Sequence, residues 1–116
     1  MYDENNIFAK ILKKEIPCNK IYEDEHSLFF NDINPQAKIH VLGIPKTQCV
    51  DYANFISLSD PKIIIAFFQS VNLVIEKLNI ANTGYRIITN SGKDGGQEVP
   101  HFHIHILAGE KIGSLR

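Results

Sequence analysis

Hydrophobic and polar residues alternate strictly over residues 101–106, and a period of two is typical of a β-strand with two different faces. The apolar set, which we expect to face the core, is Phe102, Ile104 and Ile106. The polar set on the opposite face is His101, His103 and His105. Three imidazoles in a row contribute little to packing. They suit chemistry near neutral pH, because the reference pKa of histidine is about 6.5.

Apolar residues recur at helical spacing in two other segments. The first predicts a short helix over residues 5–14, which Pro17 prevents from continuing. The second begins at Asp60 and Pro61, an N-cap acid followed by proline at the first helical position. Its apolar stripe predicts a helix that runs to about Leu78.

Four further segments have the short apolar pattern of strands, over residues 21–23, 27–31, 39–45 and 85–90. A glycine-rich turn over residues 91–96 precedes the histidine segment. Most strands are sequence neighbours and long crossovers are few. This order predicts an antiparallel α+β sheet with helices packed on one face.

Composition and charge narrow the class of protein. The chain has 116 residues, which fits a single domain over 1–116, with 44% apolar residues and a formal charge of -1. This balance gives no field that would attract nucleic acid or an anionic membrane, and no apolar run reaches the roughly 20 residues of a membrane span. The acidic, polar start does not resemble a signal peptide, so we expect a cytoplasmic protein with Cys18 and Cys49 reduced.

Side chains two apart on a strand lie roughly 6.5–7 Å apart, which decides between the uses of three histidines. One zinc ion cannot easily bind all three, although a site of two histidines completed by His40 remains an alternative, as does a purely structural role. A transfer reaction fits better. One neutral imidazole can attack phosphorus while its neighbour stabilises anionic oxygen or protonates a leaving group. Backbone amides near Gly95 and Gly96 are able to approach a phosphate.

Residues 96–107 resemble the histidine triad motif, His-x-His-x-His followed by apolar residues. Upstream, segments 7–11, 14–17, 30–33, 35–37 and 40–46 are similar to the histidine triad nucleotide-binding (HINT) branch of that family. The similarity covers nearly the whole chain with consistent spacing. It is therefore much more specific than the triad alone.

The resemblance implies a five-stranded antiparallel sheet with two helices, and a homodimer whose sheets join into one sheet of ten strands. It implies a hydrolase that binds purine nucleotides and cleaves nucleoside phosphoramidates, such as an adenylate joined to an amine, through a nucleotidyl-histidine intermediate. His103 would be the nucleophile, and His105 would contact the phosphate and assist the leaving group. His101 and His40 would orient the cluster.

The same resemblance implies the binding residues. Asp32 would accept hydrogen bonds from the ribose hydroxyls. The base would lie against apolar side chains, namely Ile7, Phe8, Ile11, Phe30 and Ile33. The phosphate side would comprise Asn90, Gly96, Gln97, Glu98 and Val99.

Two positions depart from the family pattern. Many relatives carry a Cys-x-x-Cys near the first helix that helps to hold structural zinc, whereas this chain has Asn6 and Ala9 there. We therefore expect no bound metal and no other cofactor. Some relatives have serine or threonine where this chain has Glu98, and an ionised carboxylate cannot donate a hydrogen bond to phosphate.

The third histidine separates this chain from the nucleotidyl transferases, which resemble His-x-His-x-Gln. Two other functions remain open. One is cleavage of dinucleoside polyphosphates, as in the fragile-histidine-triad branch, and the other is a nucleotide-binding regulatory module. The sequence leaves the preferred purine and the physiological leaving group undetermined.

Overall fold

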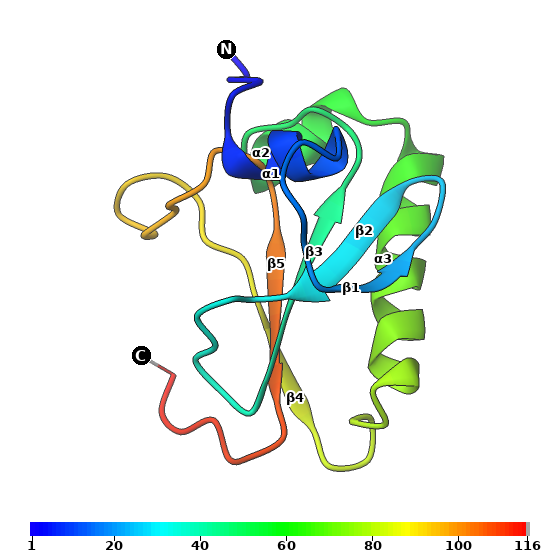
Figure 1. Cartoon of the computed structure of the whole chain (residues 1–116), viewed down its shortest axis with the longest axis vertical. Helices are drawn as coiled ribbons and strands as arrows, with labels where there is room; N and C mark the ends of the chain where they lie inside the picture. The colour runs from blue at the N-terminus through cyan, green and yellow to red at the C-terminus, as the bar shows by residue number, and fades with distance from the viewer. Residues whose placement is uncertain (116) are drawn as a thin grey trace.

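The computed structural model describes residues 1–115, in which three helices and five strands form an α+β fold. The helices are α1 (Ile7–Leu12), α2 (Tyr52–Leu58) and α3 (Pro61–Lys77), and the strands are β1 (Lys20–Glu23), β2 (Ser27–Asn31), β3 (Ile39–Pro45), β4 (Tyr85–Ile88) and β5 (Ile104–Ala108). All strand pairs are antiparallel, in the order β1-β2-β3-β5-β4 (Figure 1). The predicted fold with five antiparallel strands is confirmed. Within residues 1–115, no helix is both long enough and apolar enough to cross a membrane.

The short helix α2 was not among the predicted elements. Its N-cap is Asp51, whose side chain accepts a hydrogen bond from the backbone N–H of Asn54. The ring of Phe55 is the buried anchor of this helix. The segment was missed because seven residues with one buried side chain give almost no periodic signal.

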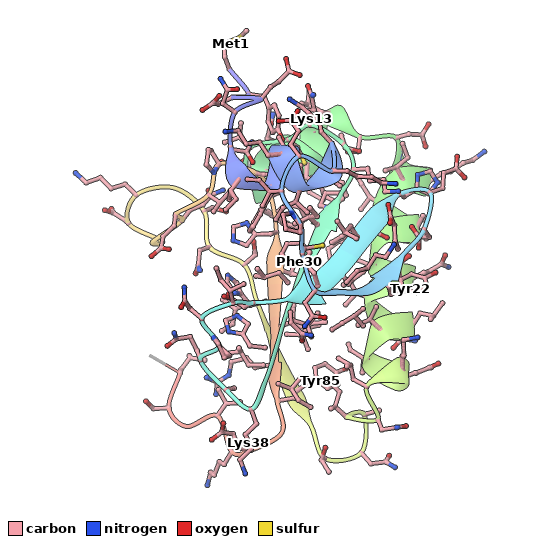
Figure 2. The ribbon with its side chains drawn as sticks, viewed as in Figure 1. Met1, Lys13, Tyr22, Phe30, Lys38 and Tyr85 are labelled. Atoms are coloured by element: carbon pink, nitrogen blue, oxygen red, sulfur yellow. The ribbon has the colours of Figure 1, made fainter. Side chains whose placement is uncertain are left out.

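The sheet buries apolar side chains on both faces. On β2, Phe29 belongs to the main core under α3, whereas Phe30 belongs to a second cluster under α1. Figure 1 shows α3, in green, behind the sheet and α1, in blue, in front of its upper end, and Figure 2 labels Phe30 below α1. The prediction that the helices pack on one face is therefore wrong. A strand with consecutive apolar residues needs a cover on each side.

The long helix α3 begins where the sequence predicts. Asp60 caps it by accepting a hydrogen bond from the backbone N–H of Lys62, and Pro61 is its first residue. The ring of Phe67 is fully buried and is stacked on Phe29 at a centroid distance of 6.0 Å. This helix is the main cover of the core face.

Helix α1 is shorter than the predicted 5–14. Asn6 is its N-cap: the side-chain oxygen accepts from Ala9 N, and the side-chain nitrogen donates to the carbonyl of Asp3. Lys13 is the C-cap, and Lys14 has a φ of 64°, a left-handed conformation that ends the helix. Asn6 thus has a structural use at the position where many relatives have cysteine.

The histidine segment is only partly a strand. β5 begins at Ile104, so the prediction of a strand from residue 101 is wrong for its first half. His101 N instead donates to the carbonyl of Val99, and Phe102 N donates to the carbonyl of Cys49. These bonds take both residues out of the ladder with β3. The neighbouring β4 also ends at Ile88 rather than residue 90.

Candidate functional site

Two of the triad histidines, His103 and His105, line a hollow of about 450 Å³ on the α1 face of the sheet. Residues from α1, β3, β5 and the flanking loops line it, namely Phe8, Asp32, Asn34, Gln36, His40, Leu42, Asn90, Gly96, Glu98, Val99, His103 and His105. The hollow brings together two of the three triad histidines, His40 and the predicted ribose-binding carboxylate. It is the candidate functional site.

The remaining predicted residues lie elsewhere. Ile11 and Phe30 are buried beneath the site in the cluster under α1. Ile7 and Ile33 are exposed, Ile33 at 86%, so neither forms a closed base pocket within one chain. His101 is fully buried behind the site.

His103 is held with one nitrogen fixed. Its Nδ1 lies 2.6 Å from the carbonyl oxygen of His101, and because a carbonyl only accepts, Nδ1 carries the proton and donates. The ring packs against Phe8 at a centroid distance of 4.9 Å. Burial lowers the pKa of His103. Near pH 7 the ring is therefore neutral, with an unprotonated Nε2, which is the form that a nucleophile needs.

His40 and His105 form a second hydrogen-bonded unit. The backbone N–H of Gln36 donates to Nδ1 of His40 at 3.0 Å, so the proton of neutral His40 lies on Nε2. That Nε2 is 2.9 Å from Nδ1 of His105 and donates to it. The proton of His105 is thereby assigned to Nε2, where it is able to donate to a bound oxyanion.

Asp32 joins this unit. Its Oδ2 lies 3.4 Å from Nε2 of His40, and its Oδ1 accepts from the backbone N–H of Asn34. Burial lowers the pKa of His40, and it lowers the pKa of His105 to about 4. The negative charge of Asp32 partly offsets this effect of burial, because it raises the pKa of both rings.

His101 is buried next to the site and does not line the hollow. Its Nε2 lies 2.9 Å from the carbonyl of Pro45, and burial lowers its pKa to about 4. Gln97 is a second support, since its side-chain nitrogen donates to the carbonyls of Val50 and Val99. Both residues therefore brace the segment that carries the site without lining the hollow.

The loop before the histidines forms one wall. Gly96 has a φ of 75°, a conformation that favours glycine, and it faces the hollow. Glu98, the departure from serine or threonine, is exposed and lines the same wall. The backbone in this wall is thus close to any ligand in the hollow.

Sequence reasoning missed three lining residues, Asn34, Gln36 and Leu42. Gln36 acts through its backbone N–H, which every residue except proline has, so its side chain gave no signal. Leu42 belongs to an apolar strand and was indistinguishable from core.

Asp32, His40 and His105 each place a ligand atom within 4.8 Å of the other two. Two nitrogens and a carboxylate suit a divalent ion such as zinc. Within this cluster, Nδ1 of His105 accepts the hydrogen bond from His40. The expectation that this chain holds no metal stays a prediction.

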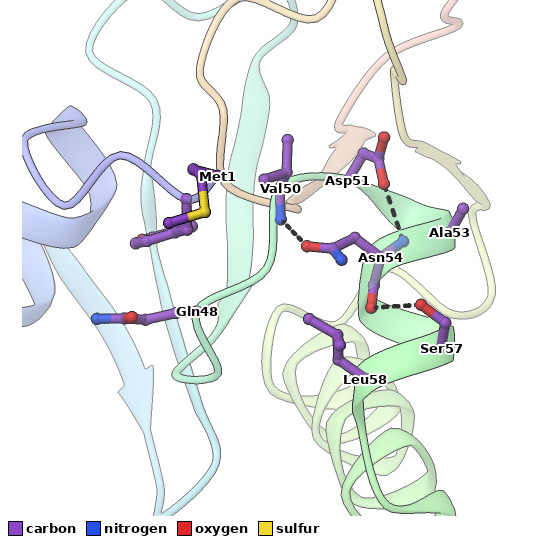
Figure 3. A pocket seen from close by; sticks show the side chains of 9 residues that line it. Met1, Gln48, Val50, Asp51, Ala53, Asn54, Ser57 and Leu58 are labelled. Carbon is purple, nitrogen blue, oxygen red and sulfur yellow. Dashed lines mark hydrogen bonds between the residues drawn. The ribbon is translucent and has the colours of Figure 1, made fainter.

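A larger hollow of about 660 Å³ lies between the N-terminal segment and α2. Figure 3 shows Met1 and Gln48 on one side of it and Asn54 and Leu58 on the other. It contains no imidazole among its lining residues, so it is a weaker candidate for the chemistry of the triad.

Comparison with known proteins decides the family. A model of the HIT domain matches residues 13–112. The chain belongs to the HIT domain family. It is 48% identical to an uncharacterised 13.2 kDa HIT-like protein of Azospirillum brasilense, over 98% of this chain and 93% of that one.

Two further HIT relatives bear on function and fold. The purine nucleoside phosphoramidase of Escherichia coli is 37% identical, over 97% of this chain and 93% of the enzyme. A histidine triad protein of Clostridium difficile has a solved structure that covers both chains completely, with 39% identity and a TM-score of 0.87. These matches support a hydrolase that acts on a nucleotide-type substrate.

Proposed function

We propose that the chain hydrolyses purine nucleoside phosphoramidates through a covalent intermediate on His103. One observation carries the proposal: His103 Nδ1 is committed to the carbonyl of His101, which leaves a neutral Nε2 free in a ring that lines the hollow. An imidazole in this state is a nucleophile at neutral pH. The 37% identity to a purine nucleoside phosphoramidase supports the substrate class.

In the first step, Nε2 of His103 attacks the α-phosphorus and the P–N bond to the amine breaks. The electron pair moves to the amine nitrogen, which takes a proton. The bound phosphate is anionic, and together with the carboxylate of Asp32 it favours an added proton on the His40–His105 unit. That proton leaves with the amine, which is general acid catalysis.

In the second step, water attacks the phosphorus and the P–Nε2 bond breaks. The electron pair returns to Nε2 of His103, and a proton of the water returns to the His40–His105 unit. While Nε2 of His105 carries a proton, before transfer to the amine and after water returns one, it donates to a phosphoryl oxygen and stabilises the negative charge there. The products are a free amine and a nucleoside monophosphate.

Turnover of a fluorogenic adenosine phosphoramidate and of diadenosine tetraphosphate tests this proposal. We expect the phosphoramidate to be cleaved much faster, and rapid acid quench to trap a nucleoside monophosphate on the peptide that contains His103. Preference for the tetraphosphate would favour a dinucleoside polyphosphate hydrolase. Nucleotide binding without turnover of either substrate would favour a regulatory module.

We also propose a homodimer in which a second copy pairs along β4. On this edge strand Ile87 is 44% exposed, although its cross-strand partner Ile106 is fully buried, and Tyr85 is 42% exposed. An apolar edge strand without a cover favours association. Light scattering at micromolar concentration is expected to give twice the chain mass of 13.1 kDa, and Ile87→Glu a monomer. A monomeric wild-type protein would contradict this proposal.

A further inference from the structure

The hydroxyl of Tyr2 lies 2.6 Å from Nδ1 of His101, across 99 positions of sequence. The two rings meet edge to face, with centroids 5.5 Å apart. His101 is fully buried, and its Nε2 donates to the carbonyl of Pro45. The neutral ring has one proton, so Nδ1 accepts and the hydroxyl of Tyr2 donates. The carbonyl of Pro45 therefore sets the tautomer of His101, and the hydroxyl of Tyr2 donates to the nitrogen that this tautomer leaves unprotonated.

The same residue, His101, holds the proposed nucleophile. Its carbonyl oxygen accepts from Nδ1 of His103 at 2.6 Å, and its N–H donates to the carbonyl of Val99. Phe8 lies against both imidazole rings, at 6.4 Å from His101 and 4.9 Å from His103. The ring of His101 is therefore fixed by two hydrogen bonds, and its backbone by two more. A change in the ring position would move the carbonyl that aligns His103.

The N-terminal segment is built to place Tyr2. Asp3 accepts three hydrogen bonds in one turn before α1: its side chain from Asn5 N, and its carbonyl from Asn6 N and Asn6 Nδ2. This turn fixes the backbone that follows Tyr2. On its other side Tyr2 lines the larger hollow beside α2, so the residue lies between solvent and the buried histidine.

We propose that Tyr2 is a positioning residue for the proposed reaction: its hydroxyl donates to Nδ1 of His101 and holds the ring in place, and so keeps the His101 carbonyl where it orients His103. This inference rests on the proposed function. Tyr2 does not line the hollow that contains His103 and His105. It acts only through His101.

Tyr2→Phe in the full chain tests this role, because it removes the donor and keeps the ring. We expect kcat to fall roughly three- to tenfold, the range that corresponds to one lost hydrogen bond, with KM changed less than twofold. The matched control is Tyr52→Phe, which removes the hydroxyl of a half-exposed tyrosine whose ring lies 6.2 Å from Phe102, the neighbour of His101. Its kcat is expected to match wild type. An unchanged kcat in Tyr2→Phe, or a change in KM alone, would overturn the inference.

A double-mutant cycle separates positioning from a general loss of structure. If Tyr2 acts through His101, Tyr2→Phe is expected to have no further effect on kcat in a His101→Gln background. An equal loss in both backgrounds would show that Tyr2 acts by another route.

Nitrogen NMR of the imidazole rings gives a readout that needs no turnover. In the wild-type protein His101 is expected to show protonated Nε2 and a hydrogen-bonded, unprotonated Nδ1. In Tyr2→Phe the Nδ1 resonance is expected to move toward that of a free ring nitrogen, and the His103 resonances to shift with it. A wild-type His101 protonated at Nδ1 would refute the inference even if phosphoramidates are cleaved. The expected spectrum without phosphoramidate turnover would instead refute the proposed function.

Discussion

The two faces of the sheet are built from the same strands but have different roles. On β5, Ile104 and Ile106 point into the core under α3, whereas His105, between them, lines the hollow on the α1 face. The core face is covered by α3 together with α2. The other face is covered by α1 at one end, and the hollow lies where that cover stops. Alternate residues of β5 thus contribute to folding stability and to the candidate site. Mutations on the two faces are therefore expected to change stability and activity separately.

The largest effect is expected on the chemical face. His103→Ala removes the proposed nucleophile, so kcat is expected to fall at least about 10³-fold while nucleotide binding remains. Single-turnover kinetics and calorimetric titration with a nucleoside monophosphate measure the two quantities. His26→Ala, a histidine in the turn between β1 and β2, is the matched control. A loss in His103→Ala of less than tenfold would mean that another group attacks phosphorus.

The core face is expected to respond in the opposite way. Phe67→Ala leaves a cavity among Phe29, Phe55 and Phe102, and the expected loss is about 3–5 kcal/mol of unfolding free energy. Activity per folded molecule is expected to stay within about twofold of wild type. Urea unfolding and turnover below the transition measure both. The neighbour Phe68, 40% exposed, supplies the control variant Phe68→Ala, with a much smaller expected loss. Equal losses would mean that the two faces are not separable.

Low pH is expected to destabilise the fold through the buried ring of His101. Burial lowers the pKa of His101 to about 4, from an ordinary value of about 6.5. Between these values the unfolded chain binds more protons than the folded chain, so stability falls as the pH drops through this window and is regained above about 6.5. The change for this one ring is on the order of 3 kcal/mol. Urea unfolding at pH 7 and pH 4.5 is expected to show a smaller difference for His101→Gln than for wild type, and equal differences would contradict the assignment.

The smallest expected effect is at Asp32, which lines the hollow and contacts His40. Asp32→Asn is expected to weaken nucleoside binding by about 1–3 kcal/mol through loss of a charged acceptor. It also removes a charge that raises the pKa of His40, His103 and His105, so the acid limb of the pH–rate profile is expected to move to lower pH. Steady-state kinetics across pH measures both. An unmoved acid limb would show that the contact with His40 has no electrostatic role.

The sequence was most informative where a pattern has one physical meaning. Asp60–Pro61 predicted the start of α3, and the alternation of Phe102, Ile104 and Ile106 identified one side of the core correctly. His103, His105, His40 and Asp32 were also expected at one site, and they line one hollow.

The errors arise where tertiary contacts override a local pattern. Alternation continues back to residue 101, yet Cys49 and Val99 draw the backbone of residues 101–102 out of the ladder with β3. The support of His101 by Tyr2, and of His40 by the backbone of Gln36, joins groups whose residue types gave no hint of such use. The Asp32–His40 contact was likewise unexpected, because Asp32 was assigned to ribose alone.

The position of β5 has a consequence for biosynthesis. It is the last of the strands within residues 1–115, yet it lies between β3 and β4. A ribosome therefore releases β3 and β4 before the strand that joins them exists, and until then the interior edges of both lack partners. This strand carries His105, and His103 and His101 precede it directly in the sequence. Completion of the sheet and assembly of the histidine cluster are thus one event, and a nascent chain truncated before residue 104 has neither.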